Sequence, residues 1–206
     1  MPCGIANPRK LLKNSRGVRL RFANCTYQTT KLIQKRSMPS LSTRPITAQD
    51  WPTYKTLRLQ SLQDAPNAFG STYAEEVVRS DEVWATRLQH ALASQKAQIF
   101  FALLDGQACG LVWCKSLDDV EATVALYQMW VAPQARRCGV GSALIHAAIA
   151  WAQSKAAQCL QLEVTTNETA AIRFYQQHGF VACGEHIALR NNSNLRMQPM
   201  LRLITN

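Results

Sequence analysis

A short segment between two apolar stretches has the residue types of a phosphate-binding loop. It spans residues 136–141 and reads RRCGVG. Glycine lets a backbone approach a ligand without interference from a Cβ atom, and successive N–H groups at the start of a helix attract anions. The two arginines would add positive charge for further phosphates. The alternative is an ordinary tight turn between a strand and a helix, because a pattern of two glycines and an arginine also arises by chance.

Two better-known phosphate loops do not fit these residues. A dinucleotide-binding loop has a third small residue three positions after its second glycine, where this chain has Leu144. A Walker loop requires Gly-Lys followed by Ser or Thr, and residues 136–141 contain no lysine. If the segment binds an anion, it is neither a dinucleotide-binding loop nor a Walker loop.

The elements on either side of the loop predict how it is held. Residues 122–131 are rich in Val, Leu, Tyr and Trp and predict a strand, which Pro133 ends. Residues 141–157 are rich in alanine, with larger apolar residues spaced for one face of a helix. Residues 159–164 alternate as a second strand. Such a strand, helix and strand in sequence predict two parallel strands joined by a right-handed crossover.

The chain before the loop predicts helices followed by antiparallel strands. Apolar residues recur at helical spacing over 48–63 and 81–94. Residues 98–104 and 108–115 read as strands joined at Asp105-Gly106, a dipeptide typical of tight hairpins. These elements place the chain in the α/β class, with antiparallel hairpins forming the first half of the sheet.

The chain after the second parallel strand predicts one more helix and a short β region. Thr166 or Asn167 would cap a helix over 168–178, and Gly179 would end it in the left-handed conformation. Residues 180–204 hold two further apolar-rich segments.

Length and charge limit the classes of protein that fit. The 206 residues, 47% of them apolar and 17% charged, provide material for one folded domain. Nine of the 23 basic residues and none of the 13 acidic ones lie in residues 1–37, which leaves residues 38–206 with a net charge of about +1. A nucleic-acid-binding domain is therefore disfavoured for residues 38–206. No apolar run reaches the ~18 residues of a membrane-spanning helix.

The basic segment 1–37 is open to three interpretations. It could be an arm for nucleic acid or anionic membrane, a transit-like leader rich in arginine and free of acid, or an extension without consequence, with Met38 opening the domain. It is not a secretory signal, because it has no apolar h-region of 7 to 15 residues.

Cysteine and histidine placement argues against disulfide and metal sites. The seven cysteines form an odd set without a C-x-x-C pair, so a reducing, cytoplasmic compartment is expected. The four histidines show no i, i+4 pair and no acidic or cysteine cluster around them, so no metal site is expected.

Three groups of residues together resemble the acetyl-coenzyme A binding core of the GCN5-related N-acetyltransferase (GNAT) superfamily. They are Val131-x-Pro133, Arg136-x-x-Gly139-x-Gly141, and Leu162-Glu163-Val164-x-x-Asn167-x-x-Ala170-x-x-x-x-Tyr175-x-x-x-Gly179-Phe180. The resemblance is dense over residues 120–183 and looser over 42–119, and residues 1–37 fall outside it.

The resemblance implies a mixed, mostly antiparallel sheet flanked by helices. Its two parallel central strands would splay apart as a V, and pantetheine would lie between them, paired with the backbone near Met129 and Val131. The backbone amides from Arg137 to Ser142 would hold the pyrophosphate. The implied coenzyme-binding set is Met129, Val131, Arg136, Arg137, Cys138, Gly139, Val140, Gly141, Ser142, Asn167 and Tyr175.

The resemblance also implies catalytic roles. Tyr175 matches the family's proton donor to the departing thiolate, whereas the alternative is a core aromatic residue. Glu163 lies twelve residues before it, a spacing similar to that of ribosomal-protein N-terminal acetyltransferases, and would act as a base through a water molecule; the alternative is a structural carboxylate. Residues 183–186 lack the paired tyrosines of those enzymes. Asn167 would hydrogen-bond pantetheine, cap the next helix, or do both.

The function that this resemblance implies is transfer of an acetyl group from acetyl-CoA to a primary amine of a small molecule or peptide, by direct attack. The alternatives are a non-catalytic acyl-CoA sensor and, less compatible with the near-neutral domain, a nucleic-acid-associated factor. Residues 64–82 are expected to line the acceptor pocket by their position in the chain. The sequence does not predict the acceptor or the oligomeric state.

Overall fold

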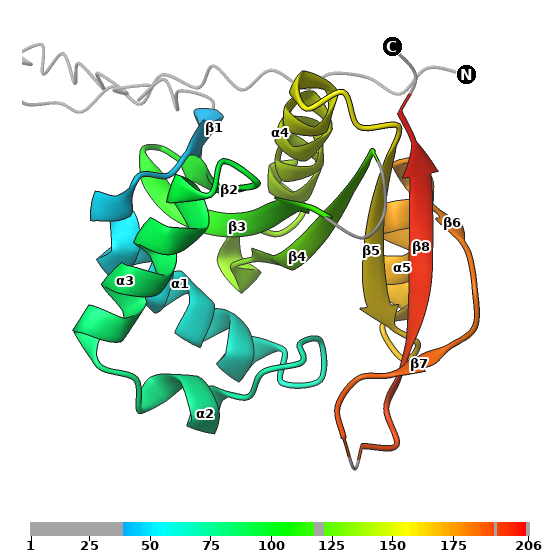
Figure 1. Ribbon diagram of the computed structural model, residues 1–206, viewed down its shortest axis with the longest axis horizontal. Coiled ribbons are helices and arrows are strands. Elements are labelled where there is room, and N and C mark those ends of the chain that lie inside the picture. Colours follow the sequence, from blue (N-terminus) through cyan, green and yellow to red (C-terminus); the bar gives the residue numbers. More distant parts are fainter. Residues whose placement is uncertain (1–38, 118–121, 192, 205–206) are drawn as a thin grey trace, which may run out of the picture. The chain divides into compact units, whose positions relative to one another are not determined.

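The computed structural model describes residues 39–117, 122–191 and 193–204, which form a sheet flanked by helices (Figure 1). The strands are β1 (Leu41–Pro45), β2 (Ala97–Leu104), β3 (Gln107–Ser116), β4 (Thr123–Val131), β5 (Cys159–Thr165), β6 (Val181–Ala182), β7 (Ile187–Ala188) and β8 (Arg196–Leu203). The helices are α1 (Trp51–Asp64), α2 (Tyr73–Val77), α3 (Asp81–Ala93), α4 (Val140–Ser154) and α5 (Thr169–Gln177). Residues 1–37, for which the sequence leaves three interpretations open, lie outside the described residues.

The sheet is mixed and mostly antiparallel, as predicted. Its strand order is β1-β2-β3-β4-β5-β8-β6, with β7 also paired to β8. β4 and β5 run parallel, and the other strand pairs among the described residues are antiparallel. The parallel pairing covers only residues 123–125 and 159–161, after which β4 and β5 diverge (Figure 1). The parallel crossover and the V-shaped splay are therefore confirmed.

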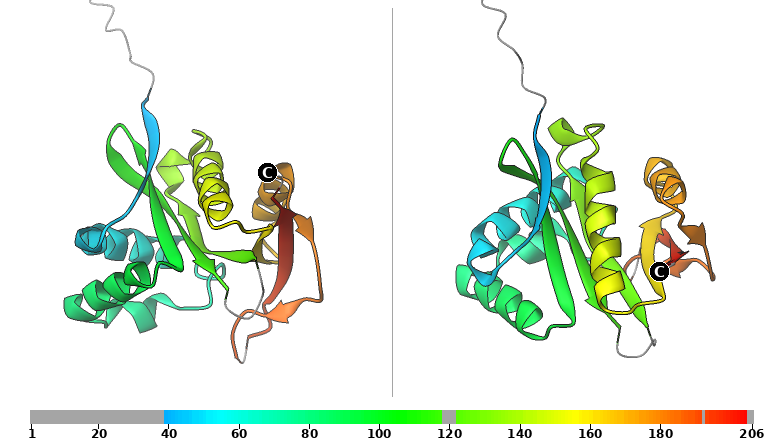
Figure 2. Two further views of the ribbon diagram at one scale, coloured as in Figure 1. Left: turned by 45° about the horizontal axis from the view of Figure 1, so that its top comes forward. Right: turned by 90° about the horizontal axis from the view of Figure 1, so that it is seen from above.

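The helices cover the two faces of the sheet. α4 lies on one face of β2, β3 and β4, and α1 to α3 lie on the other (Figure 2). α4 buries Leu144, Ile145 and Ala148, which are on the apolar face that the sequence predicted. On the opposite face, Trp84 of α3 and Leu57 of α1 are buried in the same core. The sheet between them is a rigid support for the residues at the splay.

Several element boundaries differ from the prediction. α1 begins at Trp51, after a short 3-10 turn, and α4 ends at Ser154, three residues before the expected end, because Ala156 has a positive φ of 53°. The predicted cap of α5 is wrong: Glu168 is the N-cap residue, and no side chain makes a capping hydrogen bond there. Gly179 does follow α5 in the left-handed conformation, with φ 80°.

Two elements were not predicted. β1 pairs antiparallel with β2 at the edge of the sheet, and α2 is a single short helix between α1 and α3. No helix among the described residues is long and apolar enough to cross a membrane. Within the same residues, no group of three or more His, Cys, Asp and Glu side chains is placed to hold a metal ion.

Candidate active site

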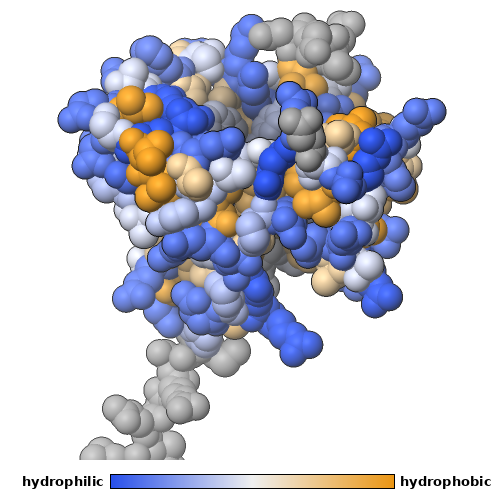
Figure 3. All heavy atoms as spheres, turned by 90° about the horizontal axis from the view of Figure 1, so that it is seen from below, coloured by the Kyte–Doolittle hydropathy of each residue, from blue (hydrophilic) through white to orange (hydrophobic). Residues whose placement is uncertain are grey.

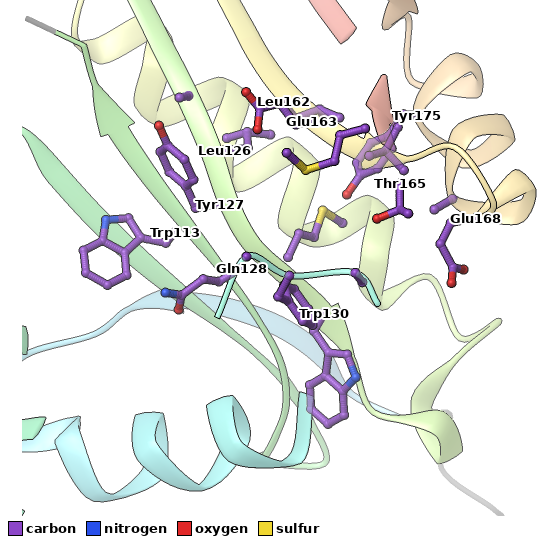
Figure 4. Close-up of a pocket in the computed structure, with 18 of the residues that line it drawn as sticks. Trp113, Leu126, Tyr127, Gln128, Trp130, Leu162, Glu163, Thr165, Glu168 and Tyr175 are labelled. Atoms are coloured by element: carbon purple, nitrogen blue, oxygen red, sulfur yellow. The ribbon is translucent and has the colours of Figure 1, made fainter. Parts of the chain in front are cut away.

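A cavity of about 640 Å³ occupies the space where β4 and β5 part. Its walls come from β4 and β5, from α5, and from the segment that follows α1 (Figure 4). Seen from below, the surface is hollowed between the half with α1 to α3 and the half with β5 and β8 (Figure 3). The described strands offer no partner to the β5-facing edge of β4 beyond Ala125, so an extended ligand could pair there.

A bulge in β4 contributes to the divergence. Trp130 pairs with Leu111 and Tyr127 with Trp113, so the register between β3 and β4 shifts between these pairs. Gln128 lies within the shift with a positive φ of 53°, and its side-chain oxygen accepts a hydrogen bond of 2.8 Å from the Tyr54 hydroxyl. A bulge bends the strand that carries it, which helps to direct the end of β4 away from β5.

The predicted phosphate loop leads directly into α4. Gly139 is the N-cap residue with φ 79° and ψ −2°, and Arg137 also has a positive φ of 65°. The first backbone bond of the helix runs from the Ala143 N–H to the Gly139 carbonyl, at 3.0 Å. The amides of residues 137–142 donate no hydrogen bond to any described residue. A left-handed residue followed by a right-handed one gathers such amides into an anion-binding concavity.

Gly141 also has a packing role, in addition to its predicted contact with the coenzyme. A Cβ atom at Gly141 would lie 3.0 Å from Cζ of Phe174, so its missing side chain lets α5 approach α4. Gly139 requires glycine for another reason, its positive φ of 79°. Cys138, directly before Gly139, is exposed, with its Sγ 3.6 Å from the Arg136 carbonyl oxygen.

Arg136 is held by the protein itself. Its Nε donates to the Val131 carbonyl at 3.1 Å, and its Nη2 forms an ion pair with Asp64. The same Asp64 carboxylate accepts a hydrogen bond of 2.8 Å from Trp130 Nε1. Arg136 therefore joins the end of α1 to the end of β4, a role that sequence reasoning missed; coenzyme contact by Arg136 stays a prediction.

His178 is a second residue near the loop that sequence reasoning missed. Its Nδ1 lies 2.8 Å from the Phe174 carbonyl oxygen and its Nε2 lies 3.0 Å from Ser142 Oγ. Because a carbonyl oxygen only accepts, Nδ1 donates to Phe174, while Nε2 shares its hydrogen bond with the Ser142 hydroxyl. This pair joins α5 to the start of α4.

Tyr175 projects from α5 into the cavity, as Figure 4 shows. Its ring contacts Phe174 and Phe180, with centroids 5.4 Å and 5.7 Å away, and its hydroxyl makes no hydrogen bond to any described residue. Burial raises the pKa of Tyr175 to about 12. The phenol therefore stays protonated at physiological pH.

Glu163 extends from β5 into the same cavity (Figure 4). Its carboxylate forms no ion pair or hydrogen bond within the described part of the chain, and partial desolvation raises the pKa of Glu163 above its ordinary value. Asn167 differs from both: it is exposed on the turn before α5, outside the cavity lining. The structure therefore brings together Tyr175 and Glu163, along with Met129 and Val131 of β4, but not Asn167.

The far part of the cavity extends toward α1 and α3. Residues 64–82 were expected to line an acceptor pocket. Of these, Ala65 and residues 68–71 line the cavity, and the others do not. The sequence did not indicate the other residues of this wall, which come from distant segments. They are Arg58 of α1, Arg87 of α3, and Trp113 and Lys115 of β3.

Comparison with known proteins agrees with this architecture. The family model described as the acetyltransferase (GNAT) family matches residues 59–180. A curated relative, an uncharacterized N-acetyltransferase of Methanocaldococcus jannaschii, is 32% identical over 73 residues, which are 35% of this chain and 32% of that relative. The match thus spans about a third of the relative's length.

Solved structures show the same fold. A GNAT-family acetyltransferase from Streptococcus pneumoniae has 26% identity and a TM-score of 0.67, over 81% of this chain and 100% of that one. A spermidine N-acetyltransferase from Vibrio cholerae, solved with CoA and spermine, has 16% identity and a TM-score of 0.66, over 80% and 95% of the two chains. With the family match over more than half of its length, the chain belongs to the GNAT family of N-acetyltransferases.

Proposed function

We propose that this protein transfers the acetyl group of acetyl-CoA directly to a primary amine of a small molecule or peptide. The observation that carries the proposal is the row of unpaired amides over residues 137–142, next to the unpaired edge of β4. The amides suit a pyrophosphate, and the strand edge suits the amide groups of pantetheine. These features fit acetyl-CoA, which would supply an activated thioester.

The residues that would hold the coenzyme are those of the loop and of β4. The pyrophosphate would accept hydrogen bonds from six consecutive backbone amides, those of Arg137, Cys138, Gly139, Val140, Gly141 and Ser142. Pantetheine would pair with backbone groups of Met129 and Val131. Arg136 would act mainly by fixing the Val131 end of β4, because Asp64 already holds its guanidinium. Asn167 would contact only a part of the coenzyme that extends out of the cavity, because Asn167 lies outside the cavity lining.

The reaction forms a bond between the amine nitrogen and the acetyl carbon and breaks the bond between that carbon and sulfur. The amine must be neutral to attack; with a pKa near 10.4 only about one lysine-like amine in 2,500 is neutral at pH 7, against about one in ten for an α-amino group near 8. Glu163 would take the proton that the nitrogen loses, through a water molecule. Tyr175 would donate its proton to the departing thiolate.

The free Tyr175 hydroxyl and the unpaired Glu163 carboxylate favour this proposal over a non-catalytic acyl-CoA sensor, which needs neither group in its cavity. We propose that residues 38–206 form the catalytic domain and that residues 1–37 are dispensable for the chemistry. The free cysteines of the described segments, among them exposed Cys138, support a reducing compartment such as the cytoplasm.

The experiment that tests the function incubates the full chain with acetyl-CoA and a panel of polyamines, antibiotic amines, amino acids and peptide N-termini. Thiol release reports turnover, and mass spectrometry identifies the acetylated amine. We expect at least one amine to be acetylated in proportion to the thiol released. Coenzyme binding without acetylation of any amine would favour the sensor.

A further inference from the structure

A buried arginine without an anionic partner lines the cavity. Arg58 of α1 is only 3% exposed, and its guanidinium lies over the ring of Phe69, 4.6 Å from the centroid. Its Nη1 is 3.5 Å from Ser61 Oγ, its buried Nε has no acceptor, and no carboxylate of the described residues lies within ion-pair distance. A buried charge is costly unless it is paired, so an anionic ligand would supply the counter-ion that the described residues do not.

The neighbouring carboxylate does not supply that counter-ion. Glu76 of α2 is buried, and one of its oxygens lies 2.9 Å from Arg79 Nε and 3.1 Å from Arg87 Nη1. Two arginines therefore already share its single negative charge. With Arg58 beside them, the cluster of Arg58, Glu76, Arg79 and Arg87 keeps an excess of positive charge.

Two further groups point to an anion in the same part of the cavity. Lys115 of β3 lines it and forms no ion pair within the described segments. Trp113, also of β3, lines it with a buried Nε1 for which the described part of the chain offers no hydrogen-bond acceptor. Cationic residues thus come from α1, α3 and β3, on one side of β4, whereas Glu163 comes from β5 on the other side.

We propose that the acceptor amine carries an anionic group, a carboxylate or a phosphate, which Arg58 and Arg87 bind while the amine faces Glu163. This inference rests on the proposed acetyl transfer and adds the substrate class to it. A guanidinium provides paired N–H donors that match either oxyanion. A polycationic acceptor such as a polyamine would instead meet like charges at this end of the cavity.

The test compares amines that differ in one anionic group. The pairs are alanine with alaninamide and phosphoethanolamine with ethanolamine, and spermidine is the polycationic probe. The carboxylate pair and the phosphate pair distinguish the two possible anions. For the favoured pair we expect kcat/KM of the anionic member to exceed that of its neutral partner by about 10-fold or more, the range of a charge-assisted hydrogen bond.

Arg58→Met should remove that advantage by raising KM for the anionic amine. If Arg58→Met fails to fold, Arg87→Gln provides a second test, because the Arg87 side chain is 42% exposed; this variant should reduce the same advantage. Arg44→Gln is the matched control, because Arg44 is also an ion-paired and partly exposed arginine, bound to Asp50, and does not line the cavity. If no panel member is acetylated, calorimetric binding of the same pairs to the CoA-saturated protein replaces kcat/KM as the readout.

The outcomes separate the two proposals. If CoA does not bind to the wild-type protein, the acetyltransferase proposal fails. If CoA binds but neutral amines or spermidine are preferred, or if the anionic preference survives in Arg58→Met and Arg87→Gln, this inference alone is overturned. Preference for the anionic amine in the wild type and in Arg44→Gln, and its loss in the cavity variants, supports it.

Discussion

Replacing Tyr175 by phenylalanine should lower the rate of acetyl transfer with little effect on stability. The hydroxyl makes no hydrogen bond to the described residues, and the ring contacts with Phe174 and Phe180 remain in the variant. Since no hydrogen bond is lost, the free energy of unfolding should change by less than about 1 kcal/mol. Loss of a general acid lowers rates by about 10²- to 10⁴-fold.

The assay for this prediction follows thiol release at saturating acetyl-CoA and acceptor, with Tyr73→Phe as the control. Tyr73 is a partly buried tyrosine of α2 outside the cavity lining, so its variant should keep the wild-type rate. Calorimetry should give the same affinity for CoA in all three proteins. An unchanged rate in Tyr175→Phe would refute the assignment of Tyr175 as the acid.

The pH profile gives a second readout of the same assignment. With a raised pKa of about 12, Tyr175 stays protonated throughout the range in which the protein can be assayed. The rate should therefore show no alkaline decline from Tyr175 below about pH 10, two units under that pKa. The opposite result would be a rate that falls at about pH 8 to 9, near the pKa of a free thiol, in the wild type but not in Tyr175→Phe. It would show that Tyr175 loses its proton well below pH 10.

Four further predictions concern the loop, the base, the fold and the N-terminal segment. Gly139→Ala places a Cβ at a φ of 79°, which costs about 1–2 kcal/mol, so calorimetry should show coenzyme binding weakened by about 10-fold. Glu163→Gln should lower kcat by about 10²-fold for amines of high pKa and less for α-amines, and should remove the acidic limb of the pH profile, because only the deprotonated carboxyl acts as a base. Arg44 holds the pKa of Asp50 at about 2, so this ion pair stabilises the fold above about pH 4, and its contribution is lost as the pH falls toward 2. In urea unfolding, the free energy of unfolding of Asp50→Asn should therefore fall less between about pH 4 and pH 2 than that of the wild type. A chain that begins at Met38 should keep the kcat and KM of the full protein, and loss of activity would show that residues 1–37 take part.

Features that are local in sequence could be predicted. The hairpin at Asp105-Gly106 and the turn at Gly179 follow from backbone conformations that these residues favour, and both glycines have a positive φ in the structure. The parallel pairing of β4 and β5 follows from the helix between them, because a crossover of that length returns the chain in the same direction. The spacing of apolar residues and the residue types at turns are visible within a few neighbouring positions, so these elements could be predicted.

Features that depend on packing between distant segments could not be predicted. Glu75 and Glu76 are adjacent in sequence, yet Glu75 is exposed and Glu76 is buried against Arg79, which follows α2, and Arg87 of α3. Arg58 has no carboxylate partner among the described residues because Arg79 and Arg87 occupy Glu76. No local sequence pattern predicts that arrangement. The bulge at Gln128 likewise depends on the register between β3 and β4.

The central claim is that the amides of residues 137–142 bind the pyrophosphate of the coenzyme. Calorimetric titration of the full chain with CoA and with pantetheine, which lacks the pyrophosphate, tests it most directly. We expect saturable heat from CoA and at least about 100-fold weaker binding of pantetheine, because charge-assisted hydrogen bonds to the pyrophosphate would be absent. Equal affinity for the two compounds, or no heat from CoA at millimolar concentration, would contradict the account.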